Sequence, residues 1–190
     1  MRFSFSNKSL VSLIMIVAVI VLLTGPTTVM AQDVATGSAT ATVLTMLTVT
    51  ATQALAFGDV MQGVRKSVAN NIDLAGGVAS GIFSIAGAAT KEISAYMQLP
   101  DYLWNSTNED RLVIAFSTTD ALVDTLPGTP GTPGLGNSGD VDPHNLPEFQ
   151  LSGAAGTAAI YLGGTVWPTV DQRNDAYSAD IVLTVAYTGN

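Results

Sequence analysis

The segment Tyr177–Tyr187 constrains the fold of this chain more than any other part of the sequence. In an extended strand its odd positions would share one apolar face: Tyr177, Ala179, Ile181, Leu183, Val185 and Tyr187. The opposite face would carry polar side chains, among them Ser178, Asp180 and Thr184. A strand with one apolar face has to pack that face and pair its backbone, so this segment predicts a β-sheet.

Other short stretches also indicate strands, because each is apolar or β-branched and is bounded by Gly, Pro, Asn or Asp. They are 55–61, 67–74, 81–86, 92–99, 112–117, 148–151 and 157–162, after an Ala, Thr and Val-rich run over 34–52. Helix signals are nearly absent from this part of the chain. We therefore expect an all-β fold, namely an antiparallel, immunoglobulin-like β-sandwich.

The first 31 residues have the three-part layout of a secretory signal peptide. Arg2 and Lys8 precede an apolar run from Leu10 to Leu23, and small residues stand at Val29 and Ala31. The run is shorter than the roughly twenty residues that span a bilayer, which argues against an uncleaved anchor. We expect cleavage between Ala31 and Gln32, a single domain over 32–190, and no membrane span in the mature chain.

Composition excludes several classes of protein. The chain has no Cys, one His and a net charge of −8, with 12% charged residues. The missing cysteines rule out disulfides, Cys-based zinc sites and thiol catalysis. The acidic balance argues against nucleic acid as a partner, since a nucleic-acid-binding protein needs a basic face. We expect no enzyme activity, no catalytic residues and no cofactor.

The polar residues that could form a ligand site are few. Asp140 and Asp142 are weak candidates for calcium, in one loop with Asn137, but the full calcium-loop signature is missing. His144 is the only histidine and has no evident catalytic support. Trp104 and Trp167 could stack against sugar rings, although core or rim anchoring is the commoner role. Asn105-Ser106-Thr107 matches the short N-glycosylation pattern.

Two segments stand apart from the expected strands. The stretch 126–147 is rich in Pro and Gly and is interpreted as a surface loop insertion. The segment 32–43 has small alternating residues, and Ala39, Ala41 and Val43 would lie on one face of a strand. That strand could be donated into a groove of a neighbouring subunit. Alternatively, it could pair within its own sheet as the first strand.

Three motifs together resemble the bacterial secreted proteins grouped as domain of unknown function 4402. They are Leu55-Ala56-Phe57-Gly58-Asp59-Val60, then Phe83–Gly87 with Ile93–Pro100, and finally Gly163-Gly164-Thr165 with Tyr177–Tyr187. Here Trp167-Pro168 alters the usual spacer after the glycine pair. The family has no established activity. The closing strand also resembles those of fimbrial and spore-coat-U-type subunits, which assemble by strand donation.

These observations predict an exported, non-enzymatic structural protein, secreted to the periplasm or cell surface. We expect a cell-surface or fimbria-like subunit that associates with itself or with a related subunit through β-strand pairing. A periplasmic chaperone is a further candidate partner. The alternative is a monomeric surface or periplasmic module that binds carbohydrate or calcium through its loops.

Overall fold

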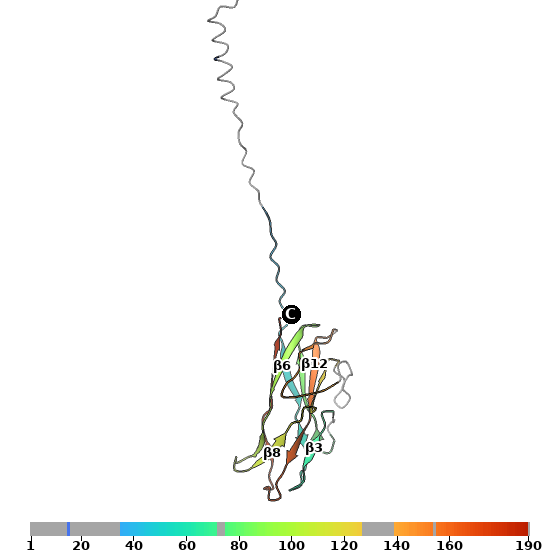
Figure 1. The fold of residues 1–190 in the computed structure, drawn as a ribbon, viewed down its shortest axis with the longest axis vertical. Coiled ribbons are helices and arrows are strands. Elements are labelled where there is room, and N and C mark those ends of the chain that lie inside the picture. Colours follow the sequence, from blue (N-terminus) through green and yellow to red (C-terminus); the bar gives the residue numbers. More distant parts are fainter. Residues whose placement is uncertain (1–14, 16–34, 72–74, 127–138, 154, 190) are drawn as a thin grey trace, which may run out of the picture. The chain divides into compact units, whose positions relative to one another are not determined.

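The structure is a computed structural model, and it describes Met15 and residues 35–71, 75–126, 139–153 and 155–189. The described residues from 42 to 189 belong to one compact unit, the larger of two. The larger unit is built from antiparallel strands, and its described residues contain no helix (Figure 1). This confirms the predicted all-β sandwich. The proposed signal segment lies almost wholly outside the described residues.

The strands are grouped into four sheets. The first contains β1 (Thr48–Gln53), β5 (Gly81–Ala86), β12 (Thr157–Leu162), β9 (Ala121–Asp124) and β10 (Asp140–Val141), in that order. The second contains β11 (Phe149–Gln150), β6 (Glu92–Gln98) and β15 (Val182–Tyr187). The third contains β14 (Tyr177–Ser178), β7 (Tyr102–Asn105), β8 (Arg111–Ala115), β13 (Gly164–Trp167) and β3 (Lys66–Val68). The fourth pairs β2 (Ala56–Phe57) with β4 (Val78–Ala79).

Two apolar clusters form the interior. The larger one lies between the first and second sheets, where Ile160 of β12 and Ile93 of β6 are both fully buried. The smaller one lies under the third sheet, and its buried members are Phe57, Val68, Leu112, Ile114 and Val166. Figure 1 shows β6 and β12 in one half of the sandwich, and β8 and β3 in the other.

Gly163 joins the two halves. It connects β12 of the first sheet directly to β13 of the third, so the chain changes sheets at this residue. A Cβ at Gly163 would collide with the carbonyl oxygen of Val68 and lie 2.9 Å from the Asn70 nitrogen. Only glycine allows the backbones to approach this closely. The glycine pair in the sequence therefore has a packing reason.

Several predicted strands agree closely with the structure. Two of the ranges, 81–86 and 157–162, are reproduced to the residue by β5 and β12. In β15 the odd positions are half-buried against the main core and the even positions are exposed, as the alternation predicted. The predicted single strand 177–187 is instead divided into β14 and β15, and Ala179 between them is exposed.

The strand expected in the run over 34–52 is present only at its end. Residues 35–47 belong to no strand, and the first strand begins at Thr48. In the Pro/Gly-rich stretch 126–147, residues 127–138 lie outside the described residues. The described remainder contains the short strand β10, which pairs with β9, so this part is not simply a loop.

Candidate functional site

The first and last strands of the sandwich leave a seam between them. β1 pairs only with β5, β15 only with β6, and β14 only with β7 among the described strands. β1 and β15 lie close together and pack against the same core, but they form no ladder with each other. An edge strand presents unpaired backbone donors and acceptors, so both sides of the seam can accept another strand.

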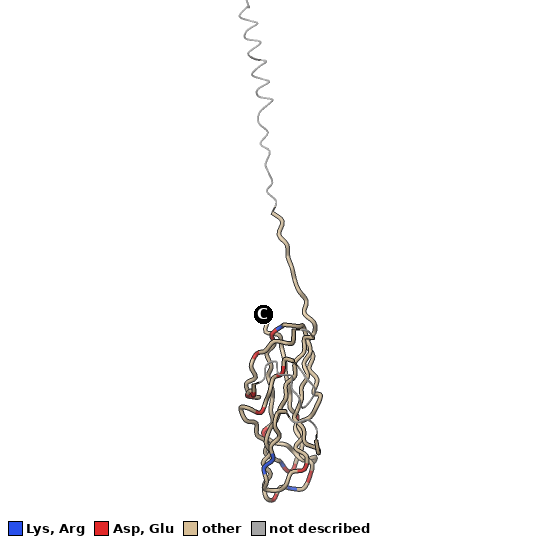
Figure 2. Tube along the Cα trace, turned by 90° about the vertical axis from the view of Figure 1, so that its right-hand side faces the viewer, with Lys and Arg blue, Asp and Glu red and all other residues tan. Residues whose placement is uncertain are grey.

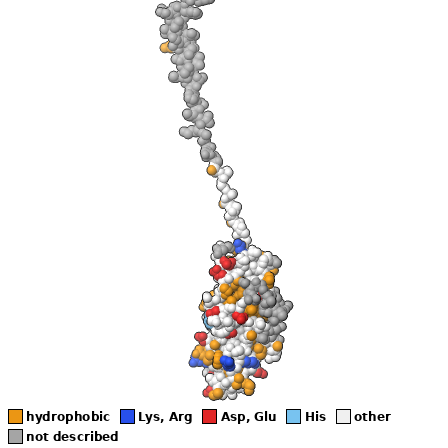
Figure 3. Space-filling view, turned by 45° about the vertical axis from the view of Figure 1, so that its right-hand side comes forward, with side chains coloured by type: hydrophobic (Ala, Val, Ile, Leu, Met, Phe, Trp, Pro, Cys, Tyr) orange, Lys and Arg blue, Asp and Glu red, His pale blue; other side chains and the backbone are white. Residues whose placement is uncertain are grey.

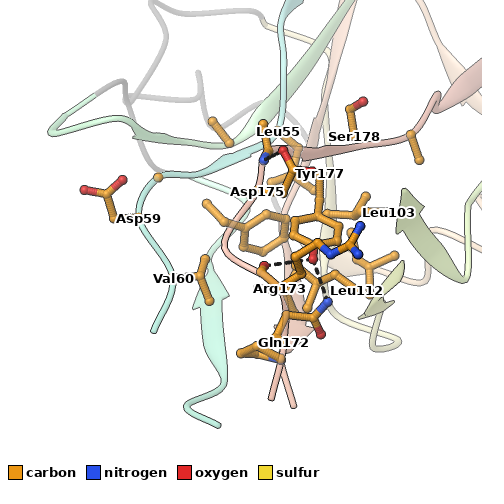
Figure 4. A pocket seen from close by; sticks show the side chains of 18 of the residues that line it. Leu55, Asp59, Val60, Leu103, Leu112, Gln172, Arg173, Asp175, Tyr177 and Ser178 are labelled. Carbon is orange, nitrogen blue, oxygen red and sulfur yellow. Dashed lines mark hydrogen bonds between the residues drawn. The ribbon is translucent and has the colours of Figure 1, made fainter. Parts of the chain in front are cut away.

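A cavity of about 910 Å³ lies beyond one end of this seam, where the chain leaves β1 at Ala54 and approaches β15 at Ile181, and no residue of either strand lines it. One wall is the chain around β2, which includes Leu55, Phe57 and Asp59. The other wall is formed by residues 172–179 and by Ile181. Buried side chains of the smaller core complete the lining, so its base is apolar. In Figure 4, Tyr177 stands among the lining side chains, with Asp59 and Val60 to one side and Leu103 and Leu112 to the other.

A polar network anchors the wall that contains Tyr177. The Tyr177 hydroxyl donates to the Asp110 carboxylate over 2.6 Å and accepts from the Gln172 amide over 2.9 Å. Gln172 also donates to Asp110 over 3.0 Å, and Gln172 is 6% exposed. Arg173 forms an ion pair with Glu109 over 3.0 Å at the surface. The segment after β13 is thereby tied to the turn between β7 and β8.

The hydrogen bonds of this network shift the pKa values of the side chains that form it. The hydrogen bond from Tyr177 is the main reason that the pKa of Asp110 lies below its ordinary value. The pKa of Tyr177 is raised, first by desolvation and then by the bond to Asp110. The hydrogen bond with Arg173 lowers the pKa of Glu109. These shifts favour an ionised Asp110 and a neutral Tyr177, which is the pair that holds the wall in place.

Asn105 is a structural residue of the same region. It is 2% exposed, and its amide donates to Thr107 and to Asp175. Its side-chain oxygen accepts from the backbone nitrogens of Glu109 and Asp110 over 2.9 and 3.0 Å. Every polar atom of this side chain is engaged inside the fold. Its place in the glycosylation pattern is therefore explained by a turn, and the amide is not presented to solvent.

Tyr187 closes the seam at the end away from the cavity. Its hydroxyl donates to the carbonyl oxygen of Thr45 over 2.8 Å and accepts from the backbone nitrogen of Ala88 over 2.6 Å. The last strand is thus linked to the chain that precedes β1 and to the turn after β5. Sequence alone identified Tyr187 only as a core-facing residue, because the partners are backbone atoms far away in the chain.

The two candidate calcium ligands have different partners. Asp140 accepts from the Asn70 amide over 2.9 Å, whereas Asp142 accepts from the backbone nitrogen and the ring of His144 over 2.9 and 3.1 Å. Asp142 therefore caps its own turn. In the described part of the chain, no three His, Asp or Glu side chains come together as a metal site. The ring of His144 also lies edge-on to the ring of Phe116, with 6.4 Å between the ring centres.

The candidate strand-donation residues are all accessible. Ala39 and Ala41 are exposed, and Val43 is 93% exposed. None of them belongs to a strand. Ala31 and Gln32, the expected cleavage site, lie outside the described residues. Trp104 and Trp167 lie in strands β7 and β13 and are partly exposed, which places them on a sheet and not in loops.

Comparisons with protein-family models, with curated proteins and with solved structures found no match to this chain. The resemblance to the secreted family therefore rests on the motifs alone. Two of these motifs border the cavity, since Leu55–Val60 and Tyr177–Ile181 supply opposite walls. Within the described residues no helix has the length and apolar character needed to cross a membrane.

Proposed function

We propose that the protein is an exported, non-enzymatic structural subunit that assembles by β-strand pairing. The N-terminal segment of one copy would enter the seam of the next copy. This proposal includes a location outside the cytoplasm, at the cell surface or in a fimbria-like fibre. The supporting observation is the seam itself, where the edge strands β1 and β15 pack against the same apolar cluster without pairing with each other.

The proposed donor and acceptor are complementary in chemistry. Residues 35–47 contain no charged side chain, and their apolar members are small or medium in size. An uncharged strand can enter the seam of an acidic protein without burying a charge. Its backbone would bond to the free edges of β1 and β15, while Ala39, Ala41 and Val43 would point to the larger apolar cluster between the first and second sheets. The alternating threonines and serine would then face solvent.

Electron microscopy of the processed protein tests this proposal. The full chain is exported by a bacterial host, purified, and inspected by negative stain, and intact mass reports the cleavage site. We expect filaments or open chains of particles. The triple variant A39D/A41D/V43D should remain dispersed, because each strand entering the seam would bury three carboxylates.

The matched control carries the same added charge on the other face. S38D/T40D/T42D should assemble like the unmodified chain, since these positions would face solvent in the donated strand. Equal loss of assembly in both variants would mean that charge alone, and not strand insertion, is responsible. Dispersed particles from the unmodified protein, with and without a co-expressed periplasmic chaperone, would contradict the proposal and favour a monomeric binding module.

A further inference from the structure

The outer face of the third sheet is aromatic. The register of β7, β8 and β13 alternates buried residues with outward ones, and Leu112 and Val166 point to the smaller core. The outward positions along these strands are Tyr102, Trp104, Arg111, Val113, Ala115, Thr165 and Trp167. Both tryptophans of the chain are therefore on the same face, 40% and 45% exposed.

Two arginines lie against the rings of this face. The guanidinium carbon of Arg111 is 4.3 Å from the centre of the Tyr102 ring, and that of Arg65 is 5.5 Å from the Trp167 ring. Such cation–π contacts hold a guanidinium flat and leave its N–H edges available. Among the described residues, neither arginine forms an ion pair with a carboxylate. Stacking on the rings thus leaves the N–H donors of two guanidinium groups exposed to solvent.

This combination differs from the rest of the molecule. The chain has a net charge of −8, yet the outward positions of β7, β8 and β13 carry no carboxylate. Acidic residues are spread along the sandwich, whereas basic ones gather at its ends (Figure 2). In Figure 3, hydrophobic and basic side chains lie side by side in the lower half, the half in which Figure 1 labels β8 and β3.

The spacing of the tryptophans suits an extended ligand. Trp104 and Trp167 are separated by two strand spacings and are offset by two residues in register. These dimensions place their Cα atoms about 12 Å apart across a nearly flat surface. One small ligand would not contact both rings, but a chain of sugar rings lying across β8 would do so.

We propose that this face binds an acidic polysaccharide. Flat apolar faces of sugar rings would stack on Trp104 and Trp167, and the carboxylates of the sugars would bond to Arg111 and Arg65. Charge complementarity selects the ligand, since the face is positive and lacks acids while the remainder of the protein is acidic. This inference is independent of assembly through the seam, because the third sheet's outer face lies on different side chains from the cavity.

Tryptophan fluorescence gives a direct test, because both reporters lie on the proposed binding face. The processed full-length protein is titrated with oligogalacturonate as the acidic glycan and with dextran as the neutral one. We expect a saturable change with oligogalacturonate that weakens as salt increases. Dextran should bind at least roughly tenfold more weakly, since it offers no carboxylate to the arginines.

Variants separate stacking from charge. W104A and W167A should each weaken binding roughly tenfold, measured by affinity electrophoresis so that the loss of a reporter does not matter. R111Q should weaken oligogalacturonate binding and leave any dextran binding unchanged. Y96A is the matched control, because Tyr96 is an exposed aromatic residue (65% exposed) on the second sheet. Circular dichroism confirms that each variant is folded, and W104F replaces W104A if the latter does not fold.

Three results would overturn the proposal. The first is no response to oligogalacturonate at low salt. The second is equal binding of dextran, or equal weakening by Y96A. The third is tighter binding of single-stranded oligothymidylate through the same residues, because aromatic rings with arginines also suit stacked bases. Loss of binding would leave filament formation unaffected, so failure here is distinct from failure of the proposed assembly.

Discussion

Removing the hydroxyl of Tyr187 should destabilise the sandwich measurably while leaving its core packing intact. In Tyr187→Phe the carbonyl oxygen of Thr45 and the backbone nitrogen of Ala88 both lose their partner. Each net hydrogen bond contributes about 0.5–1.5 kcal/mol, so the pair contributes about 1–3 kcal/mol. In a domain of this size that corresponds to roughly 2–4 °C in Tm for each kcal/mol. The ring itself stays against the core, so no cavity is created.

Urea unfolding measures this effect, with the free energy obtained by linear extrapolation. The A39D/A41D/V43D background is used so that assembly does not stabilise the folded state. Tyr96→Phe is the control, because Tyr96 lies on the partner strand β6, is 65% exposed, and has no hydroxyl hydrogen bond to any other described residue. It should change stability by less than about 0.5 kcal/mol. The reasoning is refuted if Tyr187→Phe is equally silent, or if both variants lose the same stability.

Two further predictions concern the last strand and the polar network. Leu183→Asp places a carboxylate on the half-buried face of β15, and it should lower the free energy of unfolding by roughly 2 kcal/mol and reduce the soluble yield. Asp180→Asn, at an exposed position, should change neither quantity. Equal tolerance of the two variants in expression and urea unfolding would mean that the faces of the strand are assigned wrongly. The lowered pKa of Asp110 means that its bond to Tyr177 stabilises the fold above the ordinary carboxyl range, and that this stability is lost as pH falls through the lowered pKa. The difference in unfolding free energy between the unmodified protein and Tyr177→Phe should therefore be largest near neutral pH and should shrink in acid. Because the pKa of Tyr177 is raised in the folded protein, its neutral phenol contributes to folding stability at every pH below the pKa of the free side chain. This contribution is lost as the pH rises through the raised pKa. Ultraviolet titration should show late-ionising tyrosines, Tyr177 and the desolvated Tyr161, and Tyr177→Phe should remove one of them. An unchanged titration curve, or a constant stability difference across pH, would contradict this view of the network.

Local pattern predicted the strands whose residues repeat every second position. The alternation of β15 and the apolar runs of β5 and β12 can be seen in the sequence, because successive side chains of a strand point to opposite faces. Strands β7 and β13 were not predicted, because their residues show no such pattern. β13 begins at Gly164 and ends at Trp167 before Pro168, so its residues favoured a turn. β7 lies between Pro100-Asp101 and Asn105-Ser106, which also favoured a turn.

The segment 38–43 shows what alternation alone does not determine. Its Ala, Thr and Val residues alternate as a strand would, yet the structure assigns it to none. Alternation makes a strand competent to pair but supplies no partner, and pairing is decided by which edges are free. The edges that border the seam belong to β1 and β15, and they became known only when the sheets were assembled.

The sequence by itself determined that this chain is an all-β sandwich without cysteine chemistry, because β-branched alternation and turn residues act locally. The tertiary structure decided which residues meet. It brought the Leu55–Val60 and Tyr177–Ile181 motifs to opposite walls of one cavity, and it placed Trp104 and Trp167 on one sheet face. These contacts depend on the register between strands that are distant in the chain. Register is set by the packing of whole strand faces, so it cannot be inferred from any single segment of the sequence.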